Sequence, residues 1–280
     1  MSSDLTLSLG FSPCPNDTFI FDAIVNNKIE KSGINFNFIV EDIEKLNRKA
    51  LKGELDVTKL SFHSWLYAHS EYILLDAGGA FGKNYGPLLV SKNSLNIEDN
   101  LNYKIAIPGE YTTANLLLKI FFPQIRNKQE MLFSEISDAV VNNKVDAGLI
   151  IHEDRFIYEQ KKLIKILDLG EMWGAKYNLP LPLGGIFVKR SLPKKLILEL
   201  NKLIHDSIIY GLSCKGDYMD FVKKYSSSLS EKTINSHINL YVNEYTLSLN
   251  DECKKAVNLL CEKAIQLGFI IDNNLNNFIL

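Results

Sequence analysis

The chain has 280 residues, of which 46% are hydrophobic, 31 are lysine or arginine and 33 are aspartate or glutamate, for a formal net charge of −2. This length and apolar content exclude a disordered chain or a miniature scaffold and allow one large or two modest domains. The near balance of charge gives no reason to expect a nucleic-acid partner. No apolar stretch approaches the about 18 residues that a membrane span needs.

The first residues lead directly into an apolar stretch. They show no basic region, long apolar core or small-residue cleavage site of a signal peptide. We therefore expect a cytoplasmic protein. Its four cysteines form no CxxC pair, so we expect reduced thiols, with neither a disulfide framework nor a zinc site.

Strands and helices alternate along the first third of the chain. Leu5 to Phe11 alternates as a strand, and Pro13 and Pro15 force a turn because each proline fixes its own φ angle. Asn16 or Asp17 then caps a helix. Further strands are predicted at 33–40, 55–61, 72–77 and 86–91, with helices at 42–52, capped by Asp42, and at 62–70.

The middle of the chain continues the alternation. The Pro/Gly-rich segment 178–185 is predicted as a loop before a short strand at 186–188. Alternating strands and helices favour an α/β fold with mostly parallel sheets. The other strands are predicted at 104–107, 131–133, 145–151 and 163–169, with helices at 112–122 and 134–143.

After about residue 190 the chain is predicted to be mainly helical. Helices at 193–210 and 250–267 carry apolar residues at helical spacing and stop at Gly211 and Gly268. Segments 53–61 and 143–151 resemble each other, since in each an acidic residue begins a strand that follows a helix. This similarity supports two α/β lobes, although a match this short also arises by chance.

One histidine stands at the end of a predicted buried strand. Val145 to Ile151 is rich in β-branched residues and is followed at once by charge, which puts His152 at the carboxyl end. Ligands collect at such ends in open α/β sheets, and a neutral imidazole there can act as a general base. Alternatively, His152 caps the next helix or packs at the sheet edge. A helix that starts at His152 would favour the neutral imidazole, whereas the acidic Glu153 and Asp154 would favour the charged imidazolium. The sequence leaves open which form prevails.

Three strand-to-helix junctions carry groups that suit a small anion. Ser12 to Asn16 brings hydroxyl and amide groups to the end of the first strand. Thr112 and Thr113 stand where a helix begins, so backbone N–H groups and the helix dipole favour a carboxylate. Both segments are equally explained as ordinary helix caps.

The third junction lies at the end of strand 55–61. Lys59 and Ser61 flank Leu60, so they share one face of the strand and can both contact a carboxylate, unless Lys59 is simply exposed. No nucleotide-binding, metal-binding or acyl-enzyme motif is present. The remaining histidines lack a metal-binding spacing and are expected to be structural or solvated: His63, His69, His205 and His237.

Four segments together resemble the 1,4-dihydroxy-6-naphthoate synthase family of menaquinone biosynthesis, namely 12–19, 56–61, 108–114 and 150–156. The most specific is the opening Ser-Pro-Cys-Pro-Asn-Asp, and the likeness covers the whole chain in length and order. The resemblance implies a two-lobe fold of the type II periplasmic-binding-protein kind, with mixed, mostly parallel sheets and a ligand cleft between the lobes. Residues 1–92 and 187–280 would form one lobe, and 93–186, with His152, the other.

The resemblance also implies an activity. Family members look like carbon–carbon lyases that convert cyclic dehypoxanthine futalosine to 1,4-dihydroxy-6-naphthoate and dihydroxyacetone without a metal or organic cofactor. His152 would be the catalytic base. The substrate, a small carboxylate, would contact Lys59, Leu60, Ser61, Thr112 and Thr113, with Asn16 nearby.

Some choices remain open at this stage. Ala114 is an equally good partner for the second threonine, so that pair can be displaced by one residue. The main alternative function is a solute-binding protein for a small carboxylate, which would use the same fold and contacts but would need a secretion signal. A detached sensor domain of a regulator is a third reading, although no DNA-binding helix pair precedes the first strand. The oligomeric state is not predicted.

Overall fold

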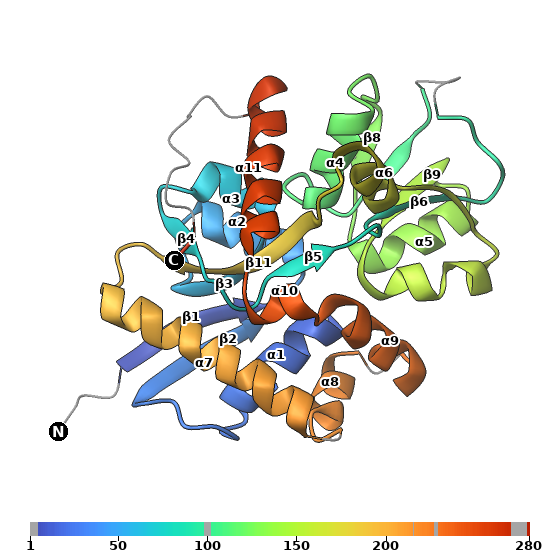
Figure 1. Ribbon diagram of the computed structural model, residues 1–280. Helices are drawn as coiled ribbons and strands as arrows, with labels where there is room; N and C mark the ends of the chain where they lie inside the picture. The colour runs from blue at the N-terminus through green and yellow to red at the C-terminus, as the bar shows by residue number, and fades with distance from the viewer. Residues whose placement is uncertain (1–4, 98–101, 215, 227–228, 270–278) are drawn as a thin grey trace.

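The computed structural model describes residues 5–97, 102–214, 216–226, 229–269 and 279–280. Two β-sheets organise this part of the chain, and Figure 1 shows the first on the left and the second on the right of the view. The first sheet has the strand order β2-β1-β3-β11-β4, with β5 paired to β11. Its strands are β1 (Leu5–Phe11), β2 (Ile34–Val40), β3 (Val57–Ser61), β4 (Tyr72–Leu74), β5 (Ala80–Gly82) and β11 (Leu181–Lys189).

The second sheet has the order β10-β6-β9-β7-β8. Its strands are β6 (Leu88–Ser91), β7 (Ile105–Ile107), β8 (Lys128–Glu130), β9 (Ala147–Ile150) and β10 (Ile164–Asp168). The chain therefore crosses from the first sheet to the second between β5 and β6 and returns between β10 and β11. In Figure 1, β5 and β11 extend from the first sheet toward the second.

Both sheets are mixed. β1 is parallel to β2 and β3, and β7 is parallel to β8 and β9. β6 is antiparallel to β9 and β10, and β11 is antiparallel to β3, β4 and β5. This agrees with the prediction of mixed, mostly parallel sheets, since all strands but one run in the same direction in each sheet. β6 and β11 are the first strands after the two crossings, and each runs against its neighbours.

The crossings also correct the predicted lobe boundaries. Strand pairing assigns Leu88–Ser91 to the second sheet and Leu181–Lys189 to the first. The predicted boundaries, after residue 92 and before residue 187, therefore both lie several residues too late in the chain. With these shifts, the division into two lobes built on the two sheets remains our proposal.

Eleven α-helices and two short 3₁₀ helices pack around the sheets in the described residues. Three apolar clusters form the core, and the largest joins residues of both sheets with α4 and α11. The helices are α1 (Pro15–Val25), α2 (Ile43–Leu51), α3 (Phe62–Ala68), α4 (Thr113–Phe121), α5 (Phe133–Val141), α6 (Leu169–Tyr177), α7 (Lys194–Ser213), α8 (Met219–Tyr225), α9 (Glu231–Tyr241), α10 (Glu244–Leu247), α11 (Asp251–Gln266), η1 (His152–Phe156) and η2 (Tyr158–Lys161). None of the described helices is long and apolar enough to cross a membrane.

Local capping explains where several helices begin. The side chain of Asp42 accepts a hydrogen bond from the N–H of Glu44 at the start of α2, as the sequence predicted. α1 differs from the prediction, because it begins at Pro15 with Cys14 as its N-cap. A proline suits the first helical position, where its missing N–H has no helical partner. Asp17 is therefore inside the helix, and its carboxylate is free to make tertiary contacts.

Three predicted boundaries were wrong for tertiary reasons. β11 begins at Leu181, inside the segment predicted as a loop, and its register shifts against β5 between Pro182 and Gly184, where an irregularity tolerates these residues. α7 continues through Gly211 to Ser213, because this glycine provides space for the ring of Phe19 and does not stop the helix. The strand predicted at 131–133 lies instead at β8, and α6 was not predicted at all.

Candidate functional site

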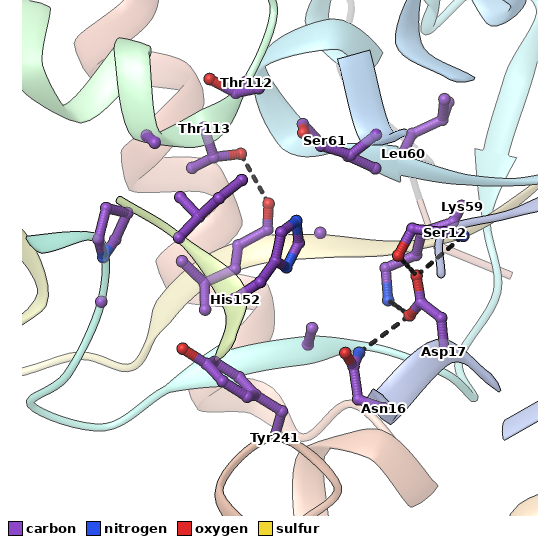
Figure 2. A pocket seen from close by; sticks show the side chains of 18 of the residues that line it. Ser12, Asn16, Asp17, Lys59, Leu60, Ser61, Thr112, Thr113, His152 and Tyr241 are labelled. Atoms are coloured by element: carbon purple, nitrogen blue, oxygen red, sulfur yellow. Dashed lines mark hydrogen bonds and ion pairs between the residues drawn. The ribbon is translucent and has the colours of Figure 1, made fainter. Parts of the chain in front are cut away.

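A pocket lies at the carboxyl ends of β3 and β9, one strand from each sheet. Its lining includes all seven residues that the sequence analysis singled out: Asn16, Lys59, Leu60, Ser61, Thr112, Thr113 and His152. Figure 2 shows that His152 and Thr113 approach the pocket from one side and Asn16, Lys59 and Ser61 from the other. The structure therefore brings together residues that are up to 136 positions apart in the chain, although their roles are still predictions.

Asp17 is the centre of a hydrogen-bond network on one wall of the pocket. Its Oδ1 accepts from Lys59 Nζ at 2.6 Å and from Asn16 Nδ2 at 2.9 Å, while Oδ2 accepts from Ser12 Oγ at 2.7 Å. The Asp17 carboxylate thus offsets the charge of Lys59, which the sequence analysis did not foresee. Because an ammonium group has three hydrogens, Lys59 still has donors left for a ligand.

Ser61 is held at the end of β3 by Asn47 of α2. The backbone N–H of Ser61 donates to Asn47 Oδ1 at 3.0 Å, and Ser61 Oγ accepts from Asn47 Nδ2 at 3.3 Å. Since the hydroxyl oxygen acts as acceptor in this contact, its own hydrogen can be donated to a ligand in the pocket.

The two threonines have different hydrogen bonds. Thr112 is the N-cap of α4, because its Oγ1 accepts from Asn115 N at 3.3 Å and donates to Gly109 O at 2.8 Å. Thr113 Oγ1 donates to Leu183 O of β11 at 2.7 Å, which ties α4 to the first sheet. The first-turn N–H groups of a helix have no intrahelical partners and attract anions. Ala114 also lines the pocket, so this geometry allows the substrate contacts to fall on Thr113 and Ala114 as well as on Thr112 and Thr113.

His152 is separated from the end of β9 by Ile151 and begins the 3₁₀ helix η1. Its φ angle of 57° lies in the left-handed region, which is uncommon for a residue with a side chain and often marks functional sites. The imidazole packs edge-on against Phe133 at 5.0 Å between ring centroids. Its Nε2 is buried and has no hydrogen-bond partner among the described residues.

Burial decides the charge of His152. Desolvation lowers its pKa from 6.5 to about 4; the nearby Asp17 raises the pKa and Lys59 lowers it further. The imidazole is therefore neutral near pH 7, which answers the question that the sequence left open. The adjacent Glu153 is also affected by burial, which raises its pKa to about 7.

Among the pocket residues that sequence reasoning did not assign to a site are His237 and Tyr241 of α9, of which His237 was expected to be structural or solvated. They are four residues apart and therefore share one face of the helix. Both are buried, and Figure 2 shows Tyr241 on the wall that α9 contributes. The available signal was a polar His–Tyr pair at helical spacing beside the apolar Ile234 and Ile238, and it was too weak to use without a fold.

Two other histidines lie outside the pocket lining, in agreement with the prediction. His63 is buried, and its Nδ1 is 3.1 Å from Thr112 O, so it supports the start of α4. His205 lies partly exposed on α7. In the part of the chain that the structure describes, no three His, Cys, Asp or Glu side chains are grouped so that they would hold a metal ion.

Residues 7–266 match the protein family described as "Menaquinone biosynthesis". Over 262 residues the chain is 39% identical to the 1,4-dihydroxy-6-naphthoate synthase of Thermus thermophilus, with 94% of this chain and 95% of the relative covered. The synthase of the same name from Streptomyces coelicolor is 34% identical over 276 residues, which cover 96% of each chain.

Solved structures agree with these sequence matches. A protein from Archaeoglobus fulgidus superimposes with a TM-score of 0.90 at 34% identity, with 95% of this chain and 98% of that chain covered. The alkanesulfonate-binding protein of Xanthomonas axonopodis pv. citri superimposes with a TM-score of 0.74 at 11% identity, with 97% and 96% covered. This last likeness concerns the fold alone, and it confirms the predicted periplasmic-binding-protein type of fold.

Proposed function

The chain belongs to the menaquinone biosynthesis family, and from this premise we propose that it is a carbon–carbon lyase acting on cyclic dehypoxanthine futalosine. The products would be 1,4-dihydroxy-6-naphthoate and dihydroxyacetone. The synthase name of both relatives supports the naphthoate product. The lyase class and the substrate are our proposal, as is a cytoplasmic location, which fractionation of cells that express the protein would test.

The observation that carries the proposal is the buried Nε2 of His152, unpartnered among the described residues, in the lining of the pocket. A general base must be unprotonated and within reach of the proton that it removes. With its pKa lowered to about 4, His152 meets the first condition at neutral pH. Its place at the end of β9 brings the imidazole to the same pocket as the proposed anion contacts.

The chemistry needs one base and no further reagent. His152 would remove the proton of a substrate hydroxyl, the oxygen would form a carbonyl, and the adjacent carbon–carbon bond would break. The released electron pair would move onto the ring oxygen of the forming hydroquinone, which then takes up a proton. Formation of the aromatic ring makes this retro-aldol cleavage favourable.

The substrate carboxylate would bind between the end of β3 and the N-terminus of α4. Ser61 can donate its hydroxyl hydrogen, and the N-terminus of α4 at Thr113 offers backbone N–H groups. Lys59 adds donors, while its charge is offset by Asp17. We propose that these groups orient the substrate so that its reactive hydroxyl faces His152.

The test is turnover of the cyclic substrate, followed by chromatography. We expect the wild-type protein to convert it to the naphthoate, and His152→Ala to bind the substrate but lose turnover by a factor of about 100 or more. A solute-binding protein would return its ligand unchanged. Near-normal turnover by His152→Ala would show that the base is assigned wrongly.

A further inference from the structure

His237 is a buried histidine whose imidazole makes no hydrogen bond within the described residues. The residue is 1% exposed, and both Nδ1 and Nε2 are inaccessible and unpartnered in that part of the chain. Leaving a buried polar atom without a partner costs about 1–3 kcal/mol. Such groups are rare in folded proteins and call for an explanation.

His63 and His69 each use Nδ1 in the fold, although His63 Nε2 is buried and unpartnered among the described residues, as is His152 Nε2. His63 Nδ1 lies 3.1 Å from Thr112 O, and His69 Nδ1 lies 2.9 Å from Leu66 O. Each of these contacts supports a helix end. His237 makes no comparable contact with the described residues through either nitrogen, and it belongs to the pocket lining.

The packing of α9 holds this imidazole in place. The helix begins at its N-cap Ser230, whose side chain accepts from Thr233 N, and it packs against α1, β5 and η1. The His237 ring lies 4.6 Å from the ring of Tyr241 and 6.1 Å from that of Phe156, measured between centroids. His152 begins η1, so the packing of α9 on η1 brings both imidazoles to one pocket from different elements.

We propose that His237 is a second catalytic residue, which donates its N–H to the substrate oxygen on which negative charge develops. This inference rests on the lyase function proposed above and adds to it the group that stabilises the oxyanion. The two imidazoles then have separate tasks, since His152 moves the proton and His237 binds the charge.

Electrostatics keep His237 in the form that this task needs. Burial lowers its pKa well below the ordinary value, and positive charge on His152 or Lys59 lowers it further. When His152 holds the substrate proton, His237 therefore stays neutral. A neutral imidazole has one N–H donor, which is sufficient to bind an oxyanion.

The step balances without a further reagent. His152 takes the proton from the substrate hydroxyl, the carbon–carbon bond breaks, and its electron pair moves onto the ring oxygen. His237 binds that oxygen through its N–H hydrogen bond. The imidazolium of His152 then returns the proton to the oxygen, so that both histidines end in their starting forms.

Two pairs of variants separate the effect of losing the N–H donor of His237 from the effect of changing the shape of its side chain. His237→Asn and His237→Leu are similar in size, as are His237→Gln and His237→Met, and in each pair only the amide offers an N–H. Turnover by the wild type and by His152→Ala is measured first. A wild type without turnover, or a His152→Ala variant that keeps it, would contradict the proposed lyase function. Results for His237 then bear on this inference alone. His205→Ala, on α7 and outside the pocket lining, controls for loss of a histidine.

We expect the Leu and Met variants to lose kcat by a factor of about 100–1,000 while KM changes little, as for removal of one oxyanion donor. At least one amide variant should recover kcat tenfold or more over its apolar partner. Folded apolar variants that keep kcat within threefold of wild type would overturn the inference. Equal losses in amide and apolar variants would also overturn it, since they indicate a purely structural role.

A measurement on the wild-type protein does not depend on how the variants fold. With ¹⁵N-labelled histidine, the ring signals of His237 should shift when 1,4-dihydroxy-6-naphthoate is added, because the product keeps the oxygen that His237 would bind. The signals of His205 should not move. A His237 signal that is unchanged at saturating product would overturn the inference.

Discussion

Lys59 and Asp17 form an ion pair of 2.6 Å in the wall of the pocket, with side chains that are only 6% and 3% exposed. The pair joins β3 to α1 across 42 positions of sequence. Asp17 also accepts from Ser12 and Asn16, so one carboxylate organises the segment after β1 together with the end of β3.

Removing the Asp17 carboxylate should destabilise the protein strongly. Asp17→Asn leaves the buried Lys59 ammonium without its counter-charge, and breaking a buried pair in this way costs about 3–5 kcal/mol. Urea unfolding of the variant should show this loss. The double variant Asp17→Asn/Lys59→Met should recover part of it, because no buried charge is left unpaired.

The control is the pair Lys202–Asp206, which is exposed on α7. Asp206→Asn should cost less than about 1 kcal/mol, since water screens exposed pairs. Equal stability of the Asp17→Asn single and double variants would contradict the explanation based on an unpaired charge.

Glu44 should make the stability depend on pH. Burial raises its pKa from 4.5 to about 7, although Asn47, Arg48 and the N–H of Tyr111 act in the opposite direction. A raised pKa in the folded state means that stability is fully present below pH 4.5 and is lost as pH rises through 7. Glu44→Gln cannot ionise, so we expect it to gain up to about 3 kcal/mol relative to wild type over this range.

Urea unfolding of both proteins at several pH values between 4.5 and 8 measures this difference. Other titrating groups, including Glu153, are present in both proteins, so their contributions to the free energy of unfolding cancel in the difference. A difference between wild type and Glu44→Gln that stays constant over the whole range would contradict the raised pKa.

His152 should remain neutral well below pH 6.5. Since its pKa is lowered to about 4, the imidazole signal in a histidine NMR titration should show no midpoint above about pH 5. The unfolded chain takes up this proton first, so the contribution of His152 to stability is lost as pH falls from 6.5 to 4. The spectrum of His152→Asn identifies the signal, and a midpoint near 6.5 would refute the expected neutrality.

Ser61 should contribute to binding of the ligand carboxylate. A hydrogen bond to a charged group contributes about 1.5–3 kcal/mol, so Ser61→Ala should weaken binding of 1,4-dihydroxy-6-naphthoate by a factor of about 10–100. Isothermal titration calorimetry measures this change. Naphthalene-1,4-diol lacks the carboxylate and serves as the matched control ligand. If Ser61→Ala weakened the binding of both ligands equally, the carboxylate would not be bound by Ser61.

The sequence by itself determined the local features of this protein. Asp42, and either Thr112 or Thr113, were predicted as helix caps because capping depends on residues within one turn, and the structure has Asp42 and Thr112 in this role. The strand before His152 was predicted from a short apolar run followed by charge, and the strand at 55–61 was predicted to end at Ser61. Residues tied to such ends could be named in advance, since α/β sheets bring their strand ends to common edges.

Only the tertiary structure decided the features that depend on distant partners. His237 enters the pocket from a helix 85 positions after His152, and no local pattern encodes that approach. The pairing of Lys59 with Asp17 and the lowered pKa of His152 follow from burial, which exists only after the chain has packed. Capping and strand ends arise from interactions between near neighbours, whereas charge states and the full pocket wall require contacts across the whole fold.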